Sequence, residues 1–204
     1  MEGESSLKPS DYEYFIFDLD GTLFNIPIDW VAVRDELEAL VREPIEGTPL
    51  FLKIQQVISA KPALKESIFS LVESHELKAV AAAKPMPGAS DLLYSLFEVS
   101  KIALVTLQGR RACDEVLRRH KLADLFEAVV TREDSLDRAL QLEAALNRLR
   151  VRPKAALFTG DRLNDVACAR KVGVPVALVG RDGADDPKPD YSFPSLLELK
   201  ASLA

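Results

Sequence analysis

The sequence lacks three features that would assign it to a special class of protein. Its 204 residues include only two cysteines, Cys113 and Cys168, which cannot supply a structural zinc site alone. No apolar run approaches the ~18–20 residues that a membrane-spanning helix needs, so we expect no membrane association. Residues 1–10 lack the basic start and the apolar stretch of a signal peptide, and we therefore expect a cytoplasmic protein.

Basic residues are also in deficit, with 26 Lys and Arg against 32 Asp and Glu and a formal net charge of −6. Proteins that bind nucleic acid concentrate basic residues on one face, so this deficit argues against a nucleic-acid partner. The composition is otherwise that of an ordinary globular chain, with 48% hydrophobic and 28% charged residues. It is compatible with a divalent cation and a small anionic substrate, and it does not indicate an oligomeric state.

Short apolar strands alternate with amphipathic helices over most of the chain. We expect strands at 12–17, 101–106, 127–131, 155–159 and 174–179. We expect helices at 89–99, 110–120, 137–150, 163–171 and 194–202. Strands that are apolar throughout indicate a parallel sheet covered on both faces. The predicted fold class is therefore α/β, with a doubly wound, Rossmann-like parallel sheet.

Residues 24–87 interrupt this alternation directly after the first strand. Helical apolar spacing recurs within them, at 29–41, 50–59 and 63–83. We therefore predict a small all-helical cap domain at 24–87. It would be inserted into a discontinuous core made of residues 1–23 and 88–204.

Polar residues follow three of the predicted strands, at the point where each strand ends. They are Asp18 to Thr22 (DLDGT), Thr106, and Gly160 to Asp165 (GDRLND). Ligands of a doubly wound sheet bind beyond the carboxyl ends of its strands, so these segments should meet at one edge. Their carboxylates would repel one another without a cation, and an all-oxygen site suits Mg²⁺. Asp18 and Asp20 could divide the work of nucleophile and general acid/base, although an ordinary Asp-Gly turn is the alternative.

The segment from Phe17 to Phe24 (FDLDGTLF) resembles the signature of the haloacid dehalogenase-like superfamily. Gly160 to Asp165 resembles the GDxxxD motif of that family. Pro85 to Leu93 is similar to the segment that follows the cap in its phosphoglycolate-phosphatase-like branch. The resemblance implies a Rossmann-like core with an inserted helical cap. It also implies a phosphatase that acts on a small phosphorylated metabolite.

The resemblance implies a role for each motif residue. Asp18 would attack phosphorus and form an aspartyl-phosphate, and Asp20 would protonate the leaving group and then activate water. Asp20 implies phosphoryl transfer, because the dehalogenating branch of the family lacks an acid there. Thr106 and the backbone N–H of Leu107 would bind phosphoryl oxygens. Mg²⁺ would be held by Asp18, the backbone carbonyl of Asp20, Asp161 and Asp165.

One position departs from the family pattern. The family has a basic residue, usually lysine, before the GDxxxD strand, and an alignment on Glu143 places Ala139 there. Arg138 and Lys84 are the candidates to supply the missing cation, with a solvated surface charge as the alternative for each. Without a replacement, the chain would be a non-catalytic or regulatory binding protein on the same fold. A phosphotransferase or mutase, in which a second hydroxyl replaces water, is the other alternative.

Overall fold

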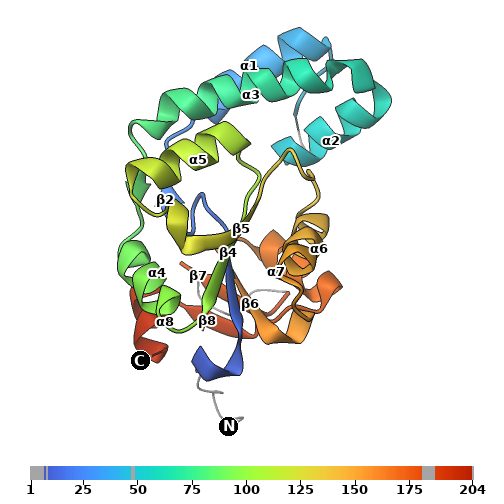
Figure 1. Cartoon of the computed structure of the whole chain (residues 1–204). Helices are drawn as coiled ribbons and strands as arrows, with labels where there is room; N and C mark the ends of the chain where they lie inside the picture. The colour runs from blue at the N-terminus through green and yellow to red at the C-terminus, as the bar shows by residue number, and fades with distance from the viewer. Residues whose placement is uncertain (1–6, 8, 47–48, 181–186, 204) are drawn as a thin grey trace.

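A six-stranded parallel sheet forms the centre of the computed structural model, which describes residues 7, 9–46, 49–180 and 187–203 (Figure 1). The strands lie in the order β5-β4-β1-β6-β7-β8, and every neighbouring pair runs parallel. Their bounds are β1 Tyr14–Phe17, β4 Lys101–Val105, β5 Phe126–Val130, β6 Ala156–Gly160, β7 Val176–Val179 and β8 Tyr191–Phe193. Because β1 lies between β4 and β6, the order of the strands reverses at β1, and ligand sites of such sheets lie at this reversal.

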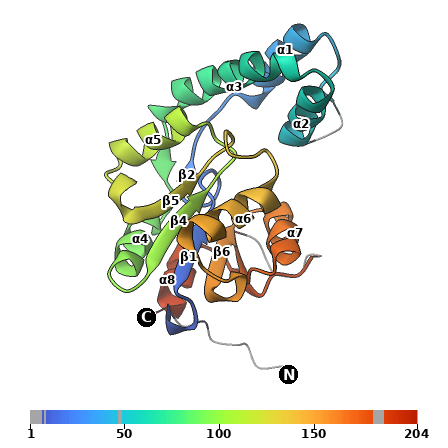
Figure 2. The same cartoon turned by 45° about the vertical axis from the view of Figure 1, so that its right-hand side comes forward.

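Helices cover both faces of the sheet, as Figure 2 shows. Side chains of α4 (Ala89–Phe97), α5 (Arg110–Arg119) and α8 (Leu196–Ser202) form one apolar cluster with the first face. Side chains of α6 (Arg138–Leu149) and α7 (Leu163–Val172) form a second cluster with the other. Phe15 and Phe17 of β1 belong to the first cluster, and Ile16 belongs to the second, as the alternation of side chains along a strand requires. The predicted doubly wound α/β fold is confirmed.

Three helices are inserted between β1 and α4 and lie beyond one end of the sheet (Figures 1 and 2). They are α1 (Trp30–Val41), α2 (Leu50–Ala60) and α3 (Lys65–Val80), with a 3₁₀ turn at Pro62–Leu64 between the last two. The Asp29 side chain caps α1 by accepting a hydrogen bond from the backbone N–H of Ala32 at 3.0 Å. Val33, Ile54 and Val72, one from each helix, are buried in the same apolar cluster as the first face of the sheet. The inserted helices and the sheet thus share one core.

Two short pieces of strand were not expected from the sequence. The segment at 24–87, expected to be all helical, begins with β2 (Phe24–Asn25) and ends with β3 (Lys84–Pro85), which pair in an antiparallel ribbon. Strands of two residues are too short to show an alternating pattern. The sixth strand, β8, was also missed, because it has three residues and the prolines at 187 and 189 indicate a loop.

Cys113 and Cys168 are both free and buried. No helix in the described part of the chain is long and apolar enough to cross a membrane.

Candidate active site

The three polar segments found in the sequence meet at the carboxyl edge of the sheet, because the strands that carry them are neighbours. Phe17, the last residue of β1, pairs with Leu104 of β4 on one side and with Thr159 of β6 on the other. Asp18 follows Phe17, and its backbone N–H donates to the carbonyl of Thr159 at 3.0 Å. The Asp18 side chain is consequently buried between the ends of β4 and β6.

Arg138 lies against Asp18 from the first turn of α6. Its Nη2 donates to Oδ1 of Asp18 at 2.6 Å, and its Nη1 donates to the carbonyl of Val105 at 2.6 Å. Its Nε lies 3.3 Å from Oδ1 of Asp165. Only 8% of Arg138 is exposed, so its charge is not a solvated surface charge. Of the two cations considered from the sequence, this is the one in contact with Asp18.

Lys84 lies elsewhere. It is an exposed residue of β3, and within the described ranges it forms no ion pair with a carboxylate. The structure therefore places Arg138, and not Lys84, in an ion pair with Asp18.

The carboxylates outnumber the cations at this edge. Burial raises the pKa of Asp18 to about 7, Arg138 opposes that shift, and the charges of Asp165 and Asp161 add to it. Burial also raises the pKa of Asp161, and Asp165 raises it further. A single buried guanidinium therefore leaves an excess of negative charge, which a divalent cation would relieve.

The oxygens available to such a cation can be sorted by their partners. Both oxygens of Asp165 are engaged, Oδ1 with Arg138 and Oδ2 with the backbone N–H of Arg162, which donates at 3.2 Å. Oδ1 of Asp161 accepts a long hydrogen bond of 3.4 Å from the hydroxyl of Thr22. Across the described residues, no three His, Cys, Asp or Glu side chains converge into a cluster that could hold a metal. Mg²⁺ commonly binds one or two carboxylates together with water and substrate oxygens, so Asp18 and Asp161 fit that ion.

Asp20 is held by the first residues of the insertion. Its Oδ1 accepts a hydrogen bond from the backbone N–H of Ile26 at 3.0 Å, and its backbone forms an isolated β-bridge with that of Phe24 at the start of β2. Burial raises the pKa of Asp20, while the Ile26 N–H and Arg162 lower it. Gly21 makes this turn with φ +88°, and a Cβ there would lie 2.4 Å from Oδ2 of Asp161. Glycine at 21 therefore lets the Asp20 turn approach Asp161.

The loop after β4 carries Thr106, whose side chain is buried. Its Oγ1 accepts from the backbone N–H of Gln108 at 3.1 Å, which leaves the hydroxyl proton free to be donated. The Thr106 carbonyl accepts from Nε2 of Gln141 at 2.8 Å. A planar trans peptide directs its N–H opposite to its carbonyl, so Gln141 sets the direction of the Leu107 N–H.

Three residues of this region were not found from the sequence. Gln141 lies on the buried face of α6 with Leu142 and Ala145, and a polar residue on a largely apolar helix face was the signal that could have revealed it. Arg132 and Glu76 are buried completely and paired with each other. Glu76 follows Ser74 and His75, and Arg132 lies between Thr131 and Glu133, so no pattern distinguished them from surface residues.

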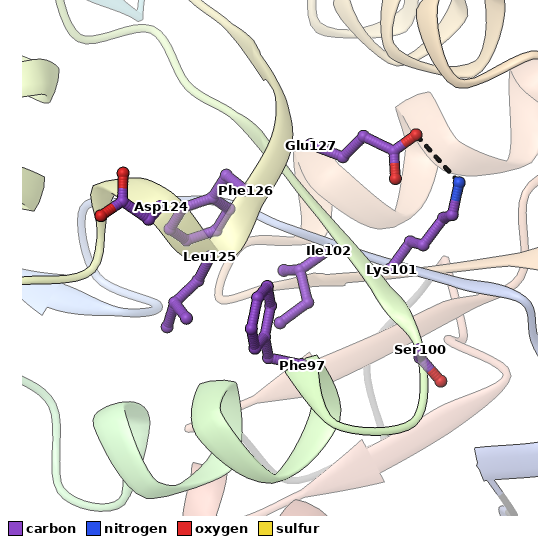
Figure 3. A pocket seen from close by; sticks show the side chains of 8 residues that line it. All are labelled: Phe97, Ser100, Lys101, Ile102, Asp124, Leu125, Phe126 and Glu127. Carbon is purple, nitrogen blue, oxygen red and sulfur yellow. Dashed lines mark hydrogen bonds and ion pairs between the residues drawn. The ribbon is translucent and has the colours of Figure 1, made fainter.

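A separate hollow of about 310 Å³ lies at the opposite end of the sheet (Figure 3). Its walls include Phe97 from the end of α4 and the first residues of β4 and β5, Lys101 and Phe126. The ion pair between Lys101 and Glu127, 3.1 Å long, lies beside it (Figure 3). Because it is at the amino ends of the strands, it is not part of the site around Asp18.

Comparison with protein families matches residues 15–179 to the model described as haloacid dehalogenase-like hydrolase. This range includes the whole of the site described above. It leaves out only the two ends of the chain, and the C-terminal end contains β8 and α8.

Curated relatives and a solved structure agree with that match. The chain is 27% identical over 202 residues to phosphoglycolate phosphatase of Pseudomonas putida, covering 85% of this chain and 72% of that protein. It is 29% identical over 107 residues to pyrophosphatase PpaX of Bacillus anthracis, covering 48% of this chain and 50% of that protein. The chain thus spans about half the length of the PpaX relatives it matches. A haloacid dehalogenase-like family hydrolase of Streptococcus pneumoniae superposes with a TM-score of 0.70 at 18% identity, covering 94% of this chain and 98% of the other.

Proposed function

This chain belongs to the haloacid dehalogenase-like hydrolase family, and from that membership and the site around Asp18 we propose that it is a Mg²⁺-dependent phosphatase of a small phosphorylated metabolite. The observation that carries the proposal is the contact of 2.6 Å between Arg138 and Asp18. A non-catalytic role was an alternative because the expected lysine is absent, and a buried arginine on the nucleophilic carboxylate removes that reason.

In the proposed reaction, Oδ2 of Asp18 attacks phosphorus while Arg138 holds Oδ1. The bond from phosphorus to the ester oxygen breaks, and Asp20 gives that oxygen a proton. Asp20 then takes a proton from water, which attacks the aspartyl-phosphate and regenerates Asp18. Thr106 Oγ1 and the Leu107 N–H donate to the phosphoryl oxygens, where negative charge develops.

A bound Mg²⁺ would stabilise negative charge on the phosphoryl oxygens. Asp18, the backbone carbonyl of Asp20 and Asp161 are the proposed ligands. Asp165 is already engaged by Arg138 and by the start of α7, so we propose that it orients Arg138 and reaches the ion through water at most. The inserted helices would act as a cap over this edge of the sheet, and their side chains would select the substrate.

Phosphate release from a panel of phosphorylated metabolites tests the function directly. We expect release from at least one small phosphomonoester with Mg²⁺ and none with excess chelator, because the excess carboxylate charge repels the substrate when no cation is bound. Asp18→Asn protein purified in the same way controls for a contaminating phosphatase. Release that is equal with Mg²⁺ and with chelator, or no release from any compound, would contradict the proposal.

Substitution of Asp161 separates the metal site from the catalytic carboxylates. Asp161→Ala should lower the affinity for Mg²⁺ by at least the ~10–100-fold that loss of an outer partner of a metal site costs, because a direct ligand is removed. Titration calorimetry of Mg²⁺ into the protein measures this without turnover. Asp114→Ala, at an exposed position on α5, is the matched control. Unchanged affinity in Asp161→Ala would rule out the assignment.

A further inference from the structure

A completely buried ion pair joins the inserted helices to the core. Glu76 lies on α3, and Arg132 lies on the loop that follows β5. Arg132 Nη1 donates to Oε1 of Glu76 at 2.6 Å, and Nη2 donates to Oε2 at 3.0 Å. Both side chains are 0% exposed. Because the contact is bidentate, it fixes the position of α3 relative to the loop after β5 as well as joining them.

Two aromatic rings of the insertion also lie near Arg132. Its guanidinium carbon lies 5.2 Å from the ring centre of Phe69 on α3 and 6.0 Å from that of Phe51 on α2. Taking two charges out of water is costly, and such pairs often add little stability compared with apolar side chains of the same size. The pair therefore calls for an explanation other than stability.

That explanation lies in the loop after β4, which the pair contacts at three successive residues. Arg132 Nη1 donates to the carbonyl of Leu107 at 3.2 Å, and the Arg132 backbone N–H donates to the carbonyl of Gln108 at 3.3 Å. The Gly109 N–H donates to Oε2 of Glu76 at 3.1 Å. A Cβ at Gly109 would lie 2.6 Å from Arg132 and 2.9 Å from Glu76, so a residue without a side chain is needed for this approach.

These contacts determine how the loop presents its donors. Arg132 holds the Leu107 carbonyl, so the N–H of the same peptide, which belongs to Gln108, points the opposite way. That N–H donates to Thr106 Oγ1, which keeps the hydroxyl proton of Thr106 available to a ligand. The direction of the Thr106 hydroxyl therefore depends on Arg132, and Arg132 is held by Glu76.

We propose that Glu76 and Arg132 are positioning residues for the loop Thr106–Gly109, and that they make its affinity for phosphate depend on α3 being seated against the core. The proposal rests on the phosphatase function proposed above, which assigns phosphate binding to this loop. If α3 moved away, Glu76 would leave with it. Arg132 and the Gly109 N–H would then lose their acceptor, and the loop would lose the contacts that shape it.

Two substitutions and a matched control test this arrangement. Glu76→Gln leaves Arg132 without its anion at nearly constant shape, and Arg132→Lys keeps the charge but loses the two-pronged contact. Arg111→Gln is the control, because Arg111 forms a solvent-exposed ion pair of 3.1 Å with Glu73, which also joins α3 to α5. Inorganic phosphate binding in the presence of Mg²⁺ is measured by calorimetry, and amide exchange at Gly109 by NMR.

We expect at least a tenfold loss of phosphate affinity and faster Gly109 exchange in both Glu76→Gln and Arg132→Lys, and neither change in Arg111→Gln. Folded variants with wild-type phosphate affinity and Gly109 exchange would overturn the proposal. If Glu76→Gln does not fold, Arg132→Lys decides the question alone. Wild-type protein that binds no phosphate would refute the phosphatase function, whereas Gly109 exchange would still report whether Glu76 shapes the loop.

Discussion

Replacing Asp18 with asparagine should reduce phosphate release to the background of the assay. The carboxamide has almost the same shape and can still accept the hydrogen bond from Arg138, but it cannot attack phosphorus. Asp20→Asn should fail differently, with the rate reduced by roughly the 10²–10⁴-fold that general acid/base catalysis supplies. The contrast follows from the positions of the two residues, since Asp18 is held by Arg138 and Asp20 by the backbone of Ile26.

Acid quenching during turnover measures this difference, because an aspartyl-phosphate survives in acid long enough to be counted. We expect no phosphorylated protein from Asp18→Asn. In Asp20→Asn we expect the aspartyl-phosphate to form slowly and to break down slowly. Circular dichroism of both variants verifies that they are folded. Near-normal turnover in Asp18→Asn would show that the covalent mechanism is wrong.

Removal of Arg138 should impair both stability and activity. Arg138→Gln leaves Asp18 and Asp165 buried without their shared cation, and breaking a buried pair in this way costs about 3–5 kcal/mol of unfolding free energy. Loss of a preorganised group at a reacting centre lowers kcat by about 10²–10³-fold, and we expect a loss of that size here. The stability and the kcat of Arg138→Lys should lie between those of the wild type and of Arg138→Gln. One ammonium group cannot reach Asp18, Asp165 and the Val105 carbonyl in the geometry of the guanidinium.

Denaturant unfolding and steady-state kinetics measure the two effects separately. Arg148→Gln is the control, since it removes a positive charge from the same helix at a position 43% exposed, where its ion pair with Asp134 is worth about 0–1 kcal/mol. A fully active and stable Arg138→Gln would mean that the contact with Asp18 contributes nothing to function, and the main support for the phosphatase proposal would be lost.

The sequence predicted the parts of the fold that repeat a pattern. Each core strand of four or five residues is mostly apolar, and each helix that covers the sheet has a regular apolar face, so the doubly wound architecture could be predicted from the pattern. β2, β3 and β8 could not be predicted, because strands of two or three residues owe their existence to partners distant in the chain.

For the candidate site, the sequence predicted its place at the carboxyl edge of the sheet but not the contacts between its side chains. Asp18, Thr106 and Asp161 each follow a strand, and the rule that ligands bind beyond strand ends was enough to group them. The choice between Arg138 and Lys84 required coordinates, because it depends on the direction of one side chain at the start of a helix. Glu76 and Arg132 lie 56 positions apart and come together only when the inserted helices pack on the core.

The antiparallel ribbon of β2 and β3 has a consequence for how the sequence between them could change in evolution. Phe24 pairs with Pro85, so the chain leaves the core and returns to it at adjacent points. A segment of another length could connect the same two points, since the entropic cost of closing a loop grows only with the logarithm of its length. The backbone therefore leaves and re-enters the core at one place, although the side chains of the insertion share the core of the sheet. An insertion of another length could alter which phosphate ester is accepted while Asp18 and Arg138 stay in place, provided that it supplies Arg132 with a buried partner as Glu76 does.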